Sequence, residues 1–305
     1  MTPLGRRSNA ESEPRPPAMP AASESPPPES PPKPEGDFLA AMVAAARRRA
    51  AEARRERPLT RPSPGAPGGR LRAALAAARR EGLGVIAEVK RASPSKGAIA
   101  PTLDAAAQAR AYGAAGAHAV SVLTEPSRFA GSLADLEAVT AAVDIPVLRK
   151  DFIVDRYQVW ESAATGAAAI LLIAAALDDG ELHRLLDECH SVSLDALVEV
   201  HEESDLRRAV TAGASLIGVN NRDLRSLTVD LATTERLAPL APQGTIVVSE
   251  SGIAGAADAR RVATAGAHAV LVGEAFVRCP ATGLPGLIAA MRSIAPAAPA
   301  AGGTR

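Results

Sequence analysis

The sequence predicts a closed (β/α)8 barrel preceded by two helices, and three observations lead to this fold class. Eight short apolar runs follow one another from residue 85 onward, and an alanine-rich segment with helical periodicity separates each run from the next. A Gly-Ala pair stands before every second run, which indicates a repeat of about 50 residues per two βα units. Eight such units over about 210 residues match a (β/α)8 barrel in number and size. An open doubly wound sheet is the alternative, but the glycine fingerprint after its first strand is missing.

The apolar runs are the expected strands, and the Gly-Ala pairs are expected to end helices, because glycine tolerates the positive φ that a helix end requires. The strands are expected at residues 85–90, 119–123, 146–150, 169–173, 196–200, 216–220, 245–249 and 269–273. The pairs are Gly116-Ala117, Gly166-Ala167, Gly213-Ala214 and Gly266-Ala267.

The chain is expected to have four parts. Residues 1–36 contain 11 of the 25 prolines and little to bury, so we expect a disordered Pro-rich tail. Residues 37–80 are expected to form an N-terminal helical extension, which carries 11 arginines against three acidic residues. A nucleic-acid patch is the alternative for these arginines, but no aromatic residues are interleaved for base stacking, so we expect a solvated helix face. The barrel is then expected over residues 81–295, and residues 296–305 as a flexible C-terminus.

Composition excludes several classes of protein. With 34 basic and 34 acidic residues the formal net charge is zero, which argues against a general nucleic-acid binder. Two cysteines do not suit a disulfide scaffold or a cysteine-based zinc module, and they are compatible with a reducing compartment. No apolar run reaches the roughly 20 residues that cross a bilayer, and the N-terminus lacks the apolar core of a signal peptide. We therefore expect a cytoplasmic protein that binds neither nucleic acid nor membrane.

Lysine is scarce, and its positions are informative. The chain has four lysines, Lys33, Lys90, Lys96 and Lys150, among its 34 basic residues. A lysine pKa can be tuned by its surroundings, whereas arginine stays charged. Codon bias alone would scatter the few lysines, but Lys90 and Lys150 end predicted strands and Lys96 follows in a loop. We therefore favour a functional role.

Polar residues gather at the ends of the predicted strands, where a closed barrel has its active site. Charged side chains on apolar strands are costly unless they are paired or used, so structural Lys–Glu clamps are the alternative reading, above all for Glu88 and Arg222. Glycines after the last two strands allow backbone N–H groups to approach an anion, which predicts a phosphate site. His118 and His268 precede strands and are expected to be structural, and His201 is a minor candidate. The strand-end candidates are Glu88, Lys90, Lys150, Asp151, Glu199, Asn220, Arg222, Glu250, Ser251, Gly273 and Glu274.

Several of these stretches resemble the indole-3-glycerol phosphate synthases, which catalyse a decarboxylating ring closure in tryptophan biosynthesis. The resemblance covers about residues 37–292 and includes every strand end. The matching stretches are IAEVKRASPSKG (86–97), SVLTEPSRFAGSL (121–133), LRKDFIVDRYQV (148–159), LVEVHEESDL (197–206), IGVNNRDL (217–224) and SESGI (249–253).

The resemblance implies that 1-(2-carboxyphenylamino)-1-deoxyribulose 5-phosphate is converted to indole-3-glycerol phosphate, with loss of CO2 and water and without a metal or organic cofactor. It implies Lys150 as the general acid, Glu199 as the general base, Lys90 as a second lysine in proton transfer, Glu88 as its orienting partner, and Asn220 as a holder of a substrate hydroxyl. The implied substrate-binding residues are Ser93, Phe129, Phe152, Arg222 and Glu250, and the implied phosphate-binding residues are Ser251, Gly252, Gly273 and Glu274.

Two alternative functions differ from this one in the residues that they would require. Another phosphate-binding barrel, such as a phosphoribosylanthranilate or histidine-pathway isomerase, would lack the two lysines with a glutamate and the SPSKG loop. A repurposed paralogue would not need Lys150, Glu199 and Asn220, although specialised duty in a secondary-metabolite pathway stays open. For the enzyme itself we expect a monomer or a weak homodimer.

Overall fold

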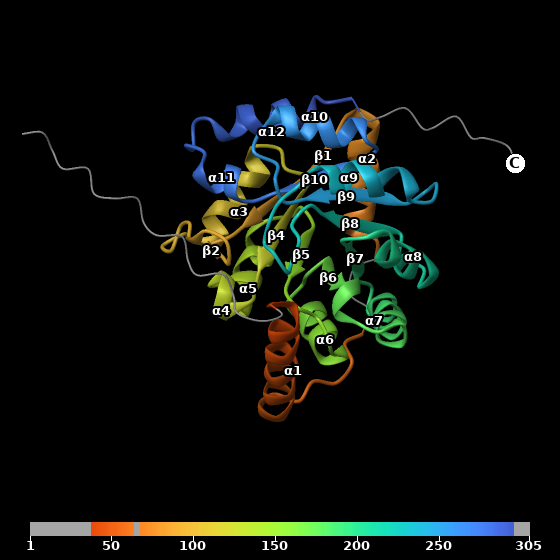
Figure 1. Cartoon of the computed structure of the whole chain (residues 1–305). Coiled ribbons are helices and arrows are strands. Elements are labelled where there is room, and N and C mark those ends of the chain that lie inside the picture. The colour runs from red at the N-terminus through yellow and green to blue at the C-terminus, as the bar shows by residue number, and fades with distance from the viewer. Residues whose placement is uncertain (1–37, 64–67, 296–305) are drawn as a thin grey trace, which may run out of the picture. The chain divides into compact units, whose positions relative to one another are not determined.

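The fold is taken from a computed structural model that describes residues 38–63 and 68–295. Within this part, eight parallel strands pair in a closed ring, which confirms the predicted barrel (Figure 1). The predicted Pro-rich tail and flexible C-terminus lie outside the described residues. In ring order the strands are β1 (Gly84–Val89), β10 (Ala269–Val272), β9 (Ile246–Glu250), β8 (Leu216–Asn220), β7 (Asp195–Val200), β6 (Ala169–Ile173), β5 (Val147–Lys150) and β4 (Ala119–Leu123).

All eight predicted strands are present, and each bound differs from the prediction by at most one residue. The glycines of the four Gly-Ala pairs have φ values of 92°, 80°, 90° and 108°, so each stands in the left-handed region as expected. The longer helices around the barrel are α3 (Ala105–Ala114), α5 (Leu133–Ala142), α6 (Arg156–Ala164), α7 (Asp179–Ser191), α8 (Glu203–Thr211), α9 (Ala232–Leu237), α10 (Ala256–Thr264) and α12 (Leu284–Arg292).

Short elements decorate the end of the barrel where the strands finish. The loop after β1 forms a small antiparallel hairpin of β2 (Ala92–Ser93) and β3 (Gly97–Ala98). The other short elements at this end are α4 (Pro126–Phe129), η1 (Ala174–Ala176) and α11 (Glu274–Arg278), whereas η2 (Ala238–Leu240) follows α9 and leads into β9.

Two histidines tie neighbouring strands together at the opposite end. His118 donates its backbone N–H to the carbonyl of Val85 (2.9 Å), and its Nδ1 accepts the N–H of Val85 (3.0 Å). His268 makes the same pair of bonds with Val247, at 2.8 and 3.0 Å. Both imidazoles therefore act as acceptors for backbone groups that would otherwise be unpaired, which fits the structural role expected for them.

The second N-terminal helix, α2 (Arg70–Glu81), contacts β1, β7 and β9. It buries Leu71, Leu75 and Ala78. Asp195, the first residue of β7, accepts the backbone N–H groups of Leu71 (2.8 Å) and Arg72 (3.1 Å). A carboxylate from the barrel thus caps the helix, because the first N–H groups of a helix have no partner within it.

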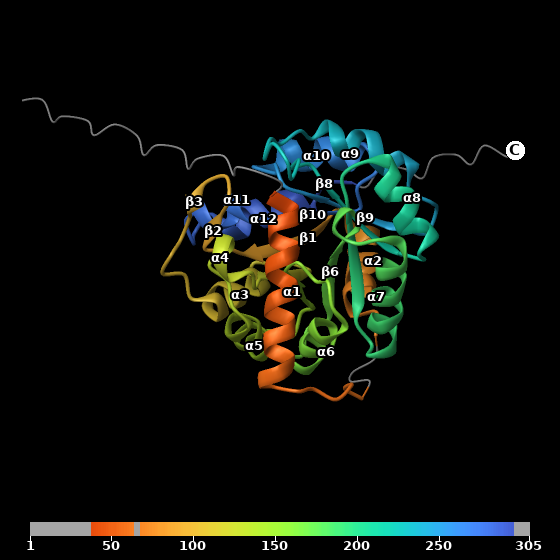
Figure 2. The same ribbon diagram turned by 60° about the horizontal axis from the view of Figure 1, so that its bottom comes forward.

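The first helix, α1 (Phe38–Glu56), runs alongside α6 (Figure 2). Its buried residues, Phe38, Met42, Ala46 and Ala50, recur every fourth position and so form one stripe facing the barrel. The stripe explains why an arginine-rich segment folds onto the protein.

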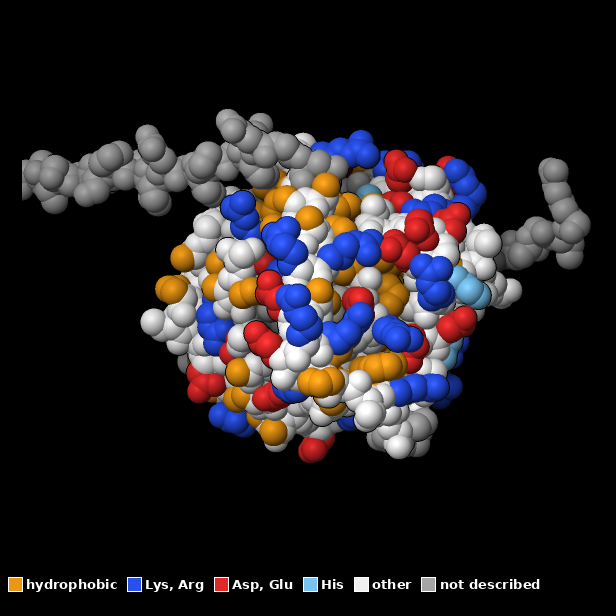
Figure 3. All heavy atoms as spheres, turned by 90° about the horizontal axis from the view of Figure 1, so that it is seen from below, with side chains coloured by type: hydrophobic (Ala, Val, Ile, Leu, Met, Phe, Trp, Pro, Cys, Tyr) orange, Lys and Arg blue, Asp and Glu red, His pale blue; other side chains and the backbone are white. Residues whose placement is uncertain are grey.

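The arginines of α1 are exposed except for Arg49, which is half-buried, so the expected solvated face is present, but some of these arginines also form ion pairs. Three of them, together with Arg57 directly after the helix, form ion pairs with acidic residues of the barrel domain, and acidic and basic side chains mingle on this face (Figure 3). The more exposed pairs, those of Arg47 and Arg54, each contribute little. Asp151 and Glu161 are buried, so their charges need such a partner. The pairs are Arg47–Glu181 (2.7 Å), Arg49–Asp151 (3.0 Å), Arg54–Asp155 and Arg57–Glu161 (2.9 Å).

Candidate active site

A cavity of about 640 Å³ opens at the end of the barrel where the strands finish. A volume of this size suits a small organic molecule. The fourteen residues to which the resemblance gives a catalytic or binding role all line it, although they come from seven strand ends and the loops that follow them. They are Glu88, Lys90, Ser93, Phe129, Lys150, Phe152, Glu199, Asn220, Arg222, Glu250, Ser251, Gly252, Gly273 and Glu274.

Lys150, the last residue of β5, lies between two carboxylates. Its Nζ is 3.1 Å from Oε2 of Glu250 and 3.5 Å from Oε2 of Glu199, and only 15% of its side chain is exposed. Burial alone would lower the pKa of this ammonium, but the charges of Glu250, Glu199 and Glu88 outweigh it and raise the pKa. Lys150 is therefore charged at neutral pH and can donate a proton to a substrate oxygen.

The two carboxylates beside Lys150 differ in their protonation. Burial works against the charge of Glu199, but Lys150, then His201 and Asn220, more than compensate and lower its pKa to about 2. Burial raises the pKa of Glu250 to about 7, and the attraction of Lys150 offsets this only in part. Apart from the Lys150 ammonium 3.1 Å from its Oε2, the Glu250 carboxylate has no hydrogen-bond partner among the described residues. Two neighbouring carboxyl groups with separated pKa values are a common arrangement for acid–base chemistry.

Lys90 and Glu88 form a second ion pair at the end of β1, with Nζ 2.6 Å from Oε1. Gly273 leaves room for this pair, because a Cβ atom there would lie 2.5 Å from Oε1 of Glu88 and 2.9 Å from Nζ of Lys90. The φ of Gly273 is −116°, so the position requires glycine for space and not for backbone conformation. The expected role of Gly273 in anion approach is thus joined by a steric one.

The expected phosphate side of the cavity is built from the loops after β9 and β10. Ser251 and Gly252 both have positive φ, at 65° and 83°. Glu274 begins α11, and the first N–H groups of a helix are free of helical partners. The carboxylate of Glu274 pairs with Arg278 at 3.0 Å, so its backbone is the part suited to an anion.

The other side of the cavity is aromatic. Phe152 is 6% exposed, and the ring of Phe38 meets it edge to face with centroids 6.3 Å apart. Phe129 also lines the cavity and packs against the core. Phe38 belongs to α1, so the N-terminal extension contributes to the wall of the site.

Similarity to known proteins identifies the family of this chain. The family model for indole-3-glycerol phosphate synthase matches residues 40–283, which is most of the chain. The chain belongs to the indole-3-glycerol phosphate synthase family. It is 58% identical over 170 residues to an indole-3-glycerol phosphate synthase from Nocardioides sp., covering 56% of this chain and 65% of that one. A synthase from Parafrankia sp. is 58% identical over 171 residues, covering 56% and 64%. The chain thus matches slightly less than two thirds of the length of these two relatives.

Solved structures of other enzymes share the barrel. Tryptophan synthase from M. tuberculosis superposes with a TM-score of 0.55 at 16% identity, over 73% of this chain and 98% of that one. A mandelate oxidase superposes with a TM-score of 0.53 at 20% identity, over 68% and 71%. At these identities the likeness concerns the fold alone.

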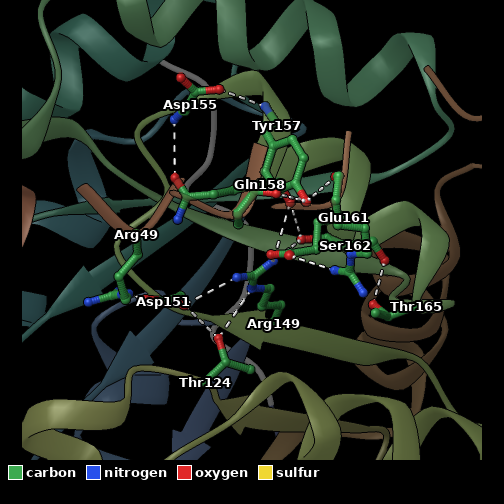
Figure 4. Close-up of polar contacts among 12 residues, drawn as sticks. Arg49, Thr124, Arg149, Asp151, Asp155, Tyr157, Gln158, Glu161, Ser162 and Thr165 are labelled. Carbon is green, nitrogen blue, oxygen red and sulfur yellow. Dashed lines mark hydrogen bonds and ion pairs between the residues drawn. The ribbon is translucent and has the colours of Figure 1, made fainter. Parts of the chain in front are cut away.

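Behind the site of this synthase-family barrel lies a buried polar network that sequence reasoning missed (Figure 4). The Asp151 carboxylate accepts hydrogen bonds from the hydroxyl of Thr124 (2.7 Å), the backbone N–H of Phe152 (2.8 Å) and the guanidinium of Arg49 (3.0 Å). Arg149, next to Lys150 on β5, pairs with Asp151 at 3.3 Å. Asp151 lines the cavity edge, but its oxygens are already engaged, so it holds the end of β5 in place.

An arginine within the apolar strand β5 was the sequence feature that could have predicted this network. Arg149 is 3% exposed on an otherwise apolar strand, and a buried guanidinium requires partners. It finds Oε2 of Glu161 at 2.9 Å and Oγ of Ser162 at 3.1 Å, both on α6. Alternation along β5 places Arg149 on the face opposite Lys150, toward the helices.

Proposed function

We propose that this chain converts 1-(2-carboxyphenylamino)-1-deoxyribulose 5-phosphate to indole-3-glycerol phosphate, with loss of CO2 and water. Membership of the family supports the proposal. The observation that carries it is the position of Lys150, a charged ammonium between Glu199 and Glu250 in a cavity with one aromatic side and one side rich in glycine and backbone amides.

Ring closure requires an acid. An electron-rich carbon of the substrate's ring attacks its ketone carbon, and the ketone oxygen takes a proton as the new carbon–carbon bond forms. We assign this proton to Lys150, because its neighbours keep it charged until the oxygen becomes basic. General acid catalysis of this kind contributes about 10²–10⁴-fold. The ring carboxylate then leaves as CO2, and its bonding electrons move toward the iminium nitrogen formed by the attack.

Dehydration requires an acid and a base. The hydroxyl formed from the ketone leaves as water, and a proton leaves the ring so that the indole becomes aromatic. We assign the base to Glu199, which is ionised and lines the cavity. Asn220 is proposed to hold the hydroxyl, and Lys90, oriented by Glu88, to share in the proton transfers.

The substrate's two ends suggest where it binds. Phe129 and Phe152 are proposed to enclose the carboxyphenyl ring, with Ser93, Arg222 and Glu250 as further contacts. The phosphate is proposed to bind the backbone of Ser251, Gly252, Gly273 and Glu274. We propose no metal and no organic cofactor; the described residues contain no group of three or more His, Cys, Asp or Glu side chains that could hold a metal ion.

Two further expectations stay proposals. We propose a cytoplasmic enzyme; in the described part of the chain no helix has the length and apolarity to span a bilayer. We also propose a monomer or a weak homodimer, which sedimentation at several concentrations would test.

The proposed reaction is tested by incubating the purified full chain with the carboxyphenylamino substrate and following indole fluorescence and CO2 release together. We expect both products to appear at equal rates. An isomerised substrate without CO2 release, or no turnover, would overturn the proposal.

A further inference from the structure

We infer that His201 is a positioning residue that acts through Glu199, as the middle member of a carboxylate–imidazole–carboxylate chain completed by Asp205. His201 was only a minor candidate from the sequence. The inference rests on the proposed function of Glu199 as the general base.

The imidazole lies directly behind Glu199. His201 Nε2 is 3.3 Å from Oε1 of Glu199, while Lys150 faces the other oxygen, Oε2, at 3.5 Å. One oxygen of this carboxylate therefore faces an ammonium and the other an imidazole that can carry a positive charge. Glu199 lines the cavity and His201 does not, so the imidazole affects a bound molecule through the carboxylate and not by touching it.

The first turn of α8 fixes the other side of the ring. Asp205 accepts the backbone N–H of His201 at 3.1 Å, and its Oδ2 lies 4.0 Å from Nδ1 of the imidazole. Asp205 is itself buried. His201 is thus held by its backbone and by the charge beside its ring, at a point where β7 has just ended.

The buried Nε2 is incompletely satisfied. Its contact with Glu199 falls short of hydrogen-bond geometry, and no other described residue bonds to it. A buried N–H without a good acceptor is costly, so a small shift of the Glu199 carboxylate toward the ring is favourable. Such a shift becomes available once a substrate oxygen takes up the attraction of Lys150.

Charged side chains from β7, α8, β9 and the loop after β8 surround the imidazole of His201. Burial lowers the pKa of His201, but Glu199 on β7, Asp205 on α8 and Glu250 on β9 together raise it above the usual value. Asp223, in the loop after β8, also feels the imidazole's charge. Below this raised pKa the imidazolium holds Glu199, and above it the hold weakens because the positive charge is lost.

The test compares kcat, KM and the pH profile of three variants. His201→Leu removes the donor, and we expect kcat to fall about tenfold or more with KM within about twofold, because the base acts only in the transition state. His201→Gln supplies an uncharged N–H donor near the position of Nε2, so we expect most of kcat to return at pH 7 and the alkaline decline due to His201 to vanish. His183→Leu, at an exposed histidine on α7, is the matched control and should behave as wild type.

A second measurement keeps the inference separate from the proposed reaction. NMR titration of the histidine ring protons, assigned with His201→Gln, should give His201 a lower pKa in Glu199→Gln than in wild type, whether or not the protein turns over the substrate. Wild-type kcat and an unchanged pH profile in both His201 variants would overturn the inference. So would a His201 pKa that does not respond to Glu199→Gln.

Discussion

Gly218 of β8 leaves the space that the Glu250 side chain of β9 fills. A Cβ atom on Gly218 would overlap Oε1 of Glu250, and would also approach its Cδ to 3.2 Å. Because this space is free, the carboxylate can lie 99% buried and still reach Lys150 at 3.1 Å. The glycine is therefore part of the acid–base site, although it has no side chain.

Replacing Gly218 by alanine should push the Glu250 carboxylate away from Lys150. We expect kcat to fall about tenfold or more, since misplacement of charged groups by about 1 Å is costly in catalysis. The atoms that must move are the end of a side chain, so the melting temperature should change by only a few degrees. Gly113→Ala is the control, because its new Cβ would meet only Ile145 at 3.7 Å. Equal kcat in the two variants would show that Glu250 tolerates displacement.

Arg49 connects α1 to the rim of the cavity, and this connection should affect substrate binding. It lies 3.0 Å from Asp151 and 3.4 Å from Glu125, and the same helix carries Phe38 against Phe152. Arg49→Ala should loosen this wall and raise KM about fivefold, the equivalent of about 1 kcal/mol of binding.

Steady-state kinetics on Arg49→Ala and Arg54→Ala checks this. Arg54 sits on the same helix and pairs with Asp155, a more exposed acid that does not line the cavity, so its loss should leave KM within about twofold. An equal rise in KM in both variants would mean that substrate binding depends on the ion pairs of α1 in general and not on Arg49 in particular.

Protonation of His268 should destabilise the barrel. Burial, with a smaller contribution from Arg79, lowers the pKa of this imidazole to about 4, below the usual 6.5. A histidine whose pKa is depressed in the folded state contributes stability above about pH 6.5, and this is lost as pH falls toward 4. Because the ring is partly exposed we expect a loss of about 1 kcal/mol, or about 2–4 °C in melting temperature, between pH 7.5 and 5.

His268→Asn provides the comparison, since its Oδ1 can accept the N–H of Val247 without titrating. The pH dependence of its melting temperature should be flatter than that of wild type over this range. Glu250, whose pKa is raised, changes stability in the opposite direction in both proteins, so it cancels from the comparison. Parallel curves for the two proteins would contradict the assignment.

The sequence predicted the strands and the cavity residues because both depend on local patterns. An apolar run such as AILLI identifies β6 by itself, and a parallel barrel brings the ends of all its strands to one rim, so Lys150 and Glu199 had to meet. Contacts between α1 and the rim, such as Arg49 with Asp151, depend on how distant segments pack and leave no local pattern. Gly218 did leave one, since a glycine within a buried strand often marks a close approach.

The central claim is that Lys150 is the acid for ring closure. The most direct measurement is kcat for Lys150→Ala and Lys150→Arg with the carboxyphenylamino substrate. We expect both to lose about 100-fold or more, because a guanidinium keeps the charge but does not give up its proton at neutral pH. The fold should survive in the alanine variant, since Glu250, with a pKa raised to about 7, can take a proton when its partner is removed. A kcat within about threefold of wild type in either folded variant would contradict the account.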